Sequence, residues 1–173
     1  MSTEENKAVI RQWIEAYNER DLEAEAAVLA PGLVVHVSAA PGPLEGVEAW
    51  RQFSGSFVEA FPDLRLTVQD IAAEGDTVAA RVDFHGTHRG EFQGIPPSGK
   101  EVAFSSMEFN RVADGKVEEH WVEVDLLGLM QQLGAIPEPG HSEETSPTES
   151  RGPSSCLYSP ECVEGYSAKL GGA

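Results

Sequence analysis

The chain has 173 residues, of which 40% are hydrophobic, and this is enough for one domain with a packed core. Its 12 basic and 29 acidic residues give a formal net charge of −17. This charge argues against nucleic acid or an anionic membrane as the partner, because both bind basic surfaces. The N-terminus shows no charged-then-apolar signal pattern, and no apolar run approaches the roughly 20 residues that cross a bilayer. We therefore expect a soluble cytoplasmic protein.

The composition of the chain changes near Ile136. Before this residue, apolar side chains recur with clear helical or strand periods, and after it the chain is rich in Pro, Ser, Gly and Glu. A segment of that composition cannot bury enough apolar surface to offset the entropy lost on ordering it. We predict one folded domain over residues 4–136 and a disordered tail over residues 137–173.

Three helices are predicted in the first part of the domain. The first is capped by Ser2 or Thr3, and its apolar stripe consists of Val9, Trp13, Ile14 and Tyr17. The second is capped by Asp21, runs to about Leu29 and is ended by Pro31-Gly32. A short strand over Leu33–Val37 follows. The third helix spans roughly Gly46–Ala60, and its buried stripe consists of Trp50, Phe53, Phe57 and Phe61.

From Arg65 onward the apolar period changes to two, which is typical of strands. We predict strands over residues 65–73, 77–88, 101–112 and 116–125, with a loop over residues 90–100. Helices followed by hairpin-linked strands and a closing helix indicate an α+β fold, in which the helices pack on a strongly curved antiparallel sheet. Such a sheet encloses a pocket, the usual place for a small ligand.

The stretch Gly115–Gly134, which reads GKVEEHWVEVDLLGLMQQLG, runs a strand pattern directly into an amphipathic helix pattern that Gly134 closes. Alternation places Trp121, Glu123 and Asp125 on one strand face, which we take as the inner one. An acid buried at the end of that strand could exchange protons near neutral pH. The alternative is that Asp125 caps the last helix by accepting a backbone N–H bond from Leu127 or Gly128.

Three parts of the sequence together resemble the SnoaL-like polyketide cyclase family, also called ester cyclases, within the nuclear-transport-factor-like superfamily. They are AFPDL, GTHRGEFQGIPPSGK and HWVEVDLLGLMQQLG, and the resemblance covers residues 6–136. It implies an α+β fold with a cone-shaped pocket, no metal or organic cofactor, and commonly a homodimer formed through the sheets. In the characterised cyclases an Asp acts as the acid/base of an intramolecular aldol closure, and Asp125 resembles it by its position in the HWxxxD segment.

His36 is the second candidate catalytic residue, because it interrupts the apolar strand LVVHV. It faces either the pocket, where it could bond a substrate carbonyl, or the outer surface. Further candidates could line an apolar pocket, although aromatic stripes at helical spacing are also typical of a plain core. These pocket candidates are Trp13, Tyr17, Trp50, Phe61, His88, Phe92, Trp121 and Glu123.

Three other features bear on the interpretation. The loop EFQGIPPSGK either covers the pocket mouth or simply connects two strands. His85 and His88 are three residues apart, so a strand places them on opposite faces, and we expect no bound metal. The tail holds Cys156 and Cys162 among Ser and Tyr residues, so it is either a plain extension or a core peptide that peptide-modifying enzymes act on.

These features favour a cofactor-independent cyclase or isomerase that acts on a small hydrophobic carbonyl compound. Asp125 would be the acid/base, and His36 would be a polar partner in the pocket. The competing interpretation is a non-catalytic module, either a ligand-binding domain or a folded leader fused to a modifiable peptide.

Overall fold

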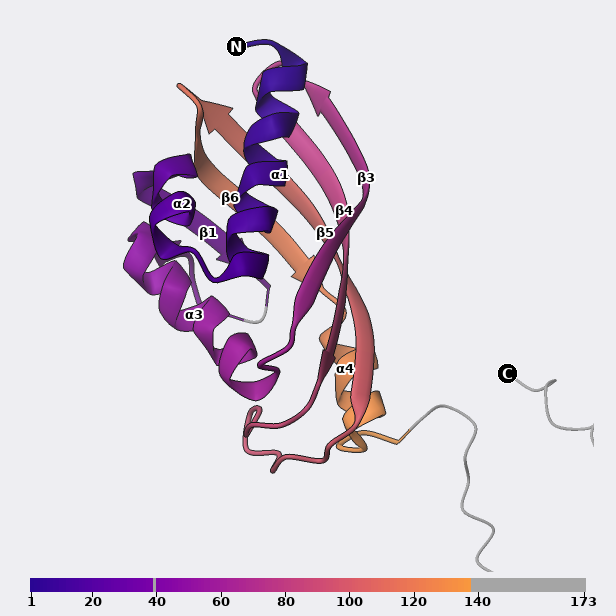
Figure 1. Cartoon of the computed structure of the whole chain (residues 1–173). Helices are drawn as coiled ribbons and strands as arrows, with labels where there is room; N and C mark the ends of the chain where they lie inside the picture. Colours follow the sequence, from indigo (N-terminus) through magenta and orange to yellow (C-terminus); the bar gives the residue numbers. More distant parts are fainter. Residues whose placement is uncertain (39, 138–173) are drawn as a thin grey trace, which may run out of the picture. The chain divides into compact units, whose positions relative to one another are not determined.

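The computed structural model describes residues 1–38 and 40–137, which form four helices and six strands. Figure 1 shows them in chain order. They are α1 (Thr3–Glu19), α2 (Leu22–Val28), β1 (Leu29–Val37), β2 (Leu44–Glu45), α3 (Gly46–Ala60), β3 (Arg65–Glu74), β4 (Thr77–Thr87), β5 (Glu101–Ala113), β6 (Lys116–Val124) and α4 (Leu126–Leu133). Within these residues, no helix is both long enough and apolar enough to cross a membrane. The predicted tail, with Cys156 and Cys162, lies outside the described residues.

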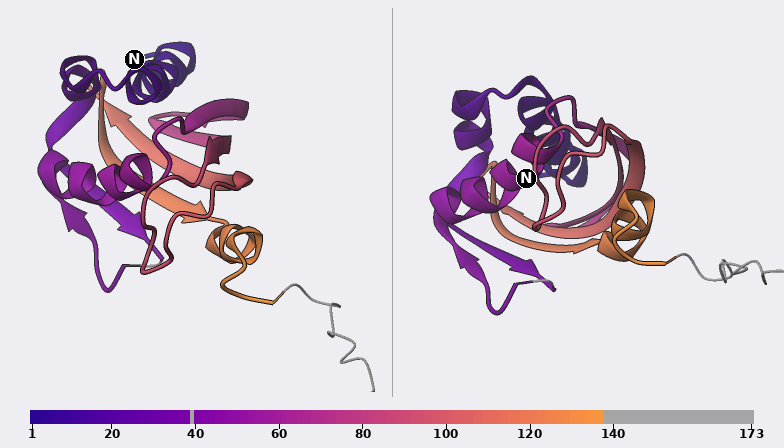
Figure 2. Two further views of the ribbon diagram at one scale, coloured as in Figure 1. Left: turned by 60° about the horizontal axis from the view of Figure 1, so that its bottom comes forward. Right: turned by 90° about the horizontal axis from the view of Figure 1, so that it is seen from below.

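The six strands form one curved sheet in the order β2-β1-β6-β5-β4-β3. Figure 2 shows the curl of the sheet, with α1 and α3 on its concave side. The predicted α+β class and the curvature are therefore confirmed. One detail differs from the expected antiparallel sheet, because β1 runs parallel to β6. This pairing follows from the chain order, since helices and a loop separate β1 from the run of hairpin-linked strands.

Helix ends follow the capping residues that the sequence offers. Ser2 accepts a bond from the Glu5 backbone N–H while the Glu5 side chain accepts one from the Ser2 N–H, which forms a complete capping box. Asp21 caps α2 through two backbone N–H groups. Gly134 ends α4 in the left-handed conformation with φ +84°. The predicted helix starts and the predicted C-cap are confirmed.

The end of α2 differs from the prediction. The helix stops at Val28, and β1 begins at Leu29, so Pro31-Gly32 lies inside a strand instead of ending a helix. The pairing of β1 with β6 is interrupted between Leu29 and Val34. Pro31 has no N–H to donate to a strand ladder, which accounts for an irregular stretch at this place.

A side chain of α4 completes the sheet where β6 ends. The last β5–β6 pair joins Ser106 to Val124, and the Asp125 N–H then donates to the Ser105 carbonyl at 2.9 Å. Two residues before Ser105 on β5, the Gln132 amide accepts from the Ala103 N–H at 2.9 Å and donates to the Ala103 carbonyl at 2.8 Å. The side chain therefore replaces a neighbouring strand for one residue, and it fixes α4 against β5.

Gly90 packs directly on the end of α3. The N–H groups of Arg89 and Gly90 both donate to the Ala60 carbonyl at 2.9 Å, and a Cβ on Gly90 would collide with the Glu59 carbonyl. We predict that Gly90→Ala lowers the free energy of unfolding by about 1–3 kcal/mol, because backbone atoms cannot rotate away as a side chain can. Urea unfolding followed by circular dichroism measures this loss.

Gly55→Ala is the matched control. A Cβ at Gly55 meets nothing within 4 Å, and the position lies inside α3. This change should therefore stabilise the protein by about 0.5–1 kcal/mol. Equal effects of the two substitutions would contradict the proposed contact.

Candidate functional site

A hollow lies between the concave face of the sheet and the helices α1 and α3. Its cavity volume is about 50 Å³, and about 560 Å³ of space lies between the surrounding atoms when the open mouth is included. Most of its surface is apolar, and Ser54, Glu108 and His120 are polar exceptions. Its lining residues are Trp13, Ile14, Tyr17, Trp50, Phe53, Ser54, Phe57, Leu66, Phe84, Glu108, His120, Val122 and Val124. Apolar clefts that contain a few polar groups typically hold small organic ligands.

Two helices supply the aromatic wall at helical spacing. Trp13 and Tyr17 lie one turn apart on α1, and Trp50, Phe53 and Phe57 follow one face of α3. The rings meet edge to face, with centroids 5.4 Å apart for Trp13 and Trp50 and 5.7 Å apart for Phe53 and Phe57. The wall is therefore built from flat, rigid groups.

Glu108 is the acidic residue of the hollow. Alternate residues of β5 point inward, and Ser106, Glu108 and Asn110 take three successive inward positions. Glu108 is 5% exposed and accepts a bond from Ser106 Oγ at 2.8 Å. Burial raises the pKa of Glu108 to about 7, against a smaller lowering effect of the Ser106 bond. In the described part of the chain, no cationic side chain pairs with this carboxyl group.

His120 is the buried histidine of the hollow. Asn110 donates through Nδ2 to the Val78 carbonyl at 3.4 Å, so its Oδ1 faces His120 Nδ1 at 2.7 Å. An amide oxygen only accepts, and therefore Nδ1 carries the hydrogen and Nε2 offers a lone pair. Burial, with a smaller contribution from the charge of His36, lowers the pKa of His120 to about 3. The ring is neutral at physiological pH.

Tyr17 adds a neutral hydroxyl to the wall. Its hydroxyl donates to the Ser54 carbonyl at 3.2 Å. Burial raises the pKa of Tyr17 to about 12, partly offset by the charge of Arg20. The phenol therefore keeps its proton and can take part in hydrogen bonds, but it does not act as a base near neutral pH.

The structure places Asp125 outside this hollow. The side chain is exposed and caps α4 by accepting the Gly128 N–H at 2.8 Å. A shallow outer groove holds it together with Asp83, His85 and Ser105. This contact matches the alternative of a helix cap, and the acid/base role of Asp125 stays a prediction without support from its position.

The prediction that Trp121, Glu123 and Asp125 occupy the inner strand face was wrong. Across the β5–β6 pair, Arg111 faces Glu119 whereas Val112 faces Val117, so Glu118 is an extra residue. This β-bulge reverses the alternation that begins at Val117. His120 and Val122 therefore point inward, and Trp121 and Glu123 point outward.

His36 lies on the outer face with Trp121. Their rings stack with centroids 5.1 Å apart, and His36 Nε2 lies 3.1 Å from Glu119 Oε1. Ser38 Oγ donates to Glu123 at 2.5 Å beside them. The hydrogen bonds that His36 and Arg111 make to Glu119 lower the pKa of Glu119. The catalytic role predicted for His36 is therefore not supported by its position.

The remaining candidates divide into two groups. Trp13, Tyr17 and Trp50 line the hollow. Phe61, His88 and Phe92 are buried beside it in the core and are not among its lining residues. His88 accepts the Ser98 N–H at 3.2 Å and so helps to hold the loop over residues 90–100 in place.

Glu108 and His120 were not selected from the sequence as residues of the hollow. The signal in the sequence was the β5 stretch from Val102 to Val112, in which every second residue is buried. Apolar side chains occupy both ends of this buried face, and Ser106, Glu108 and Asn110 interrupt it. Polar residues on the buried face of a strand require partners or a function.

The sequence of the chain matches a family model and is similar to a named cyclase. The family model for SnoaL-like polyketide cyclases matches residues 7–133. Aklanonic acid methyl ester cyclase DnrD from Streptomyces peucetius is 28% identical over 131 residues, which cover 73% of this chain and 88% of DnrD.

Solved structures extend this similarity. AclR from Streptomyces galilaeus, for which hydroxylase activity is proposed, superposes with a TM-score of 0.71 at 34% identity, covering 79% of this chain and 85% of AclR. IdmH from Streptomyces antibioticus, for which polyketide cyclase activity is proposed, gives a TM-score of 0.68 at 35% identity, covering 75% and 98%.

The raised pKa of Glu108 makes stability depend on pH. The folded chain keeps this proton up to about pH 7, whereas the unfolded chain releases it near the ordinary value of 4.5. Between these values the folded state binds more protons, so the stability that this proton gives is lost as pH rises from about 4.5 to 7. Replacing Glu108 by Gln should remove this loss.

We predict that the stability advantage of Glu108→Gln over the wild type grows by up to about 3 kcal/mol between about pH 4 and about pH 8. Urea unfolding at each pH measures the difference. Glu101→Gln, at an exposed position of the same strand, should show no comparable growth. A constant difference for Glu108→Gln across this range would refute the assigned titration.

Proposed function

The chain belongs to the SnoaL-like polyketide cyclase family, and on this premise we propose that it is a cofactor-independent cyclase or isomerase. Its substrate would be a small hydrophobic carbonyl compound of the polyketide class, and it would act in the cytoplasm. The observation that carries the proposal is the carboxyl group of Glu108, which is buried in an apolar hollow and has a pKa of about 7. Such a group is suited to both accept and return a proton near neutral pH.

The proposed reaction is an intramolecular aldol closure. Glu108 as carboxylate removes a proton from a carbon between two carbonyl groups, where the C–H bond is already acidic. The resulting enolate carbon attacks a second carbonyl carbon of the same molecule, so a C–C bond forms and the C=O π bond opens to an alkoxide. Protonated Glu108 then returns its proton to that oxygen. The product is an isomer of the substrate, and no other reactant is consumed.

His120 and Tyr17 would hold the substrate during this step. The Nε2 lone pair of His120 can accept a bond from a substrate hydroxyl, because the Asn110 contact fixes the tautomer. Glu108 faces Val122 across the β5–β6 pair, and His120 is two residues from Val122 on the same strand face. This diagonal relation brings the side chains of Glu108 and His120 within reach of one small guest.

Glu108→Asn and Glu108→Gln, compared with Asp125→Asn, test whether Glu108 or Asp125 is the acid/base residue. We use aklanonic acid methyl ester, the compound in the name of the relative DnrD, and follow formation of a product of equal mass by liquid chromatography and mass spectrometry. Loss of the acid/base group should lower kcat at least about 100-fold. Asp125→Asn should keep kcat within about threefold, because this residue caps a helix end.

The opposite pattern, with loss in Asp125→Asn and full activity in Glu108→Gln, would restore the prediction made for Asp125. Binding of this ester by the wild type without any conversion would favour the alternative of a non-catalytic ligand-binding domain. The leader hypothesis requires modification of the tail, so mass spectrometry of the natively expressed chain provides its separate test.

We also propose that two copies of the chain pair through the outer faces of their sheets. Phe109 and Trp121 face each other across β5 and β6, Met107 is the next outward residue of β5, and all three are exposed. Arg81 and Arg111 lie beside acidic residues around this patch. A face with both charge signs can be complementary to itself under a two-fold axis.

Phe109→Arg should therefore convert a dimer into a monomer, because a two-fold contact would bring the new charge close to its symmetry mate. Sedimentation velocity of wild type and variant measures this change. Leu127→Arg is the matched control, since Leu127 is as exposed as Phe109 but lies on α4. A monomeric wild type, or a dimer that persists in Phe109→Arg, would rule out this interface.

A further inference from the structure

A buried carboxyl group stands behind the aromatic wall of the hollow and takes no part in the proposed reaction. Glu25 belongs to the short helix α2, where it is 4% exposed while its neighbours Ala24 and Ala26 are exposed. It is not a lining residue of the hollow. A buried acid must have hydrogen-bond partners, so its contacts indicate what it does.

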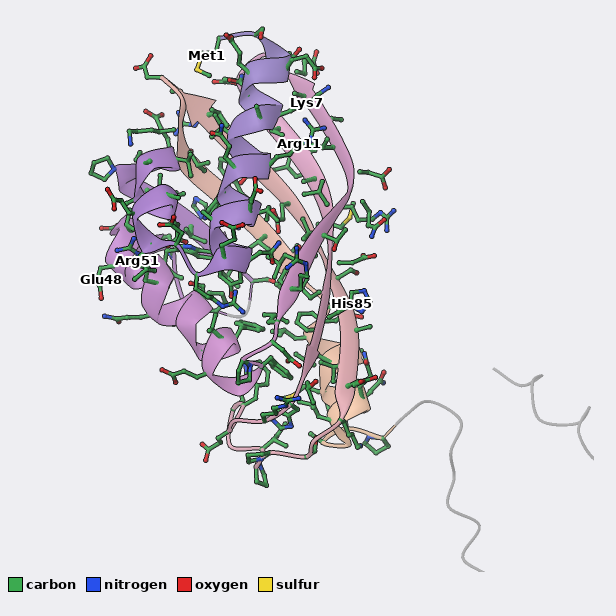
Figure 3. All side chains as sticks on the ribbon, viewed as in Figure 1. Met1, Lys7, Arg11, Glu48, Arg51 and His85 are labelled. Atoms are coloured by element: carbon green, nitrogen blue, oxygen red, sulfur yellow. The ribbon has the colours of Figure 1, made fainter. Side chains whose placement is uncertain are left out.

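Three N–H groups converge on Glu25. The indole Nε1 of Trp50 donates to Oε1 at 3.0 Å, and the indole Nε1 of Trp13 approaches the same oxygen at 3.4 Å. Arg51 Nε donates to Oε2 at 3.2 Å, and Arg51 Nη2 donates to the Leu22 carbonyl at 2.6 Å. Figure 3 shows Arg51 on α3 beside α2. One side chain of α2 thus connects α1 and α3.

The two indoles line the hollow and also pack against the ring of His120. Because both N–H groups point at one oxygen atom, the two rings are held at a fixed angle, with 62° between their planes. Each ring meets His120 edge to face, with centroids 4.9 Å away for Trp13 and 5.5 Å away for Trp50. A rotation of either indole would therefore move the surface against which His120 packs.

We infer that Glu25 is a positioning residue that fixes Trp13 and Trp50. It thereby sets the shape of the part of the hollow beside these two rings, which we call the slot. This inference rests on the proposed function, since it concerns the same hollow, and it assigns selection of flat aromatic guests to a residue that does not touch them. Without Glu25 the indole N–H groups would lose their acceptor, and each ring could turn toward another partner. The slot would then lose its fixed width.

The experiment compares four variants in a Trp121→Phe background, so that Trp13 and Trp50 are the remaining tryptophans. Glu25→Leu removes the acceptor. Glu25→Gln keeps an amide oxygen for the indoles and loses the Arg51 contact. Glu23→Gln, at an exposed position of the same helix, is the matched control. Trp50→Phe keeps an aromatic ring but removes its N–H group.

Three readouts separate positioning from mere structural support. Near-UV circular dichroism reports whether the tryptophans are rigidly held, and quenching of their fluorescence by 1,8-dihydroxyanthraquinone gives the affinity of the slot for a flat guest. Turnover of aklanonic acid methyl ester gives KM and kcat separately. For Glu25→Leu we expect loss of the near-UV signal, at least about tenfold weaker binding and a comparable rise in KM, with kcat within about threefold.

Glu25→Gln and Glu23→Gln should bind the anthraquinone within about twofold of the background protein, and Trp50→Phe about threefold to tenfold more weakly. A folded Glu25→Leu variant with unchanged near-UV signal and unchanged affinity overturns the inference. If Glu25→Leu does not fold, Glu25→Met, which also removes the acceptor, is measured in its place and decides in the same way. If no variant or wild type converts the ester, the proposed function fails, while the dichroism and the anthraquinone affinities still decide the role of Glu25.

Discussion

The burial of the Glu108 carboxyl group, which no cationic side chain of the described residues pairs with, is the constraint on which the rest of the site depends. Glu108 has a hydroxyl from Ser106 and an apolar hollow around it, so the folded protein favours its neutral form. Phe104 and Val112 on the same face are apolar. An apolar residue in place of Glu108 would remove the free-energy cost of burying a carboxyl group. The protonation state instead lies close to balance near neutral pH, and a small guest that excludes the remaining water would change it further.

The hollow combines this one adjustable group with fixed surroundings. His120 is held in one tautomer by Asn110, Tyr17 is held by a backbone carbonyl, and the two indoles are held from behind by Glu25. Each of these contacts comes from a different pair of elements, so the site is fixed from the sheet and from three helices at once. Preorganised polar groups in a site that excludes water are a general source of catalytic rate enhancement.

Local signals in the sequence were sufficient for most of the fold. The third helix was predicted with the bounds that α3 has, and Asp21 and Gly134 take the capping roles expected of them. The site was harder to predict, because its geometry depends on one extra residue. Glu118 forms a bulge that only the pairing of β5 with β6 reveals, and alternation counted along one strand cannot detect it. Trp121, Glu123 and Asp125 were therefore placed on the wrong face, and Glu108 went unnoticed on a strand that otherwise alternates regularly.

The amide of Gln132 bonds both backbone groups of Ala103 at the place where β6 has already ended. The length of β6 therefore fixes where α4 packs against β5, and with it where Leu129 and Leu133 join the core. Two more residues in β6 would displace Gln132 by one strand repeat, so that its amide would face another residue of β5 and the two leucines would leave their places in the core. Within the described residues, no side chain of α4 lines the hollow. Such a change in a single strand would therefore act on the core and leave the aromatic wall as it is.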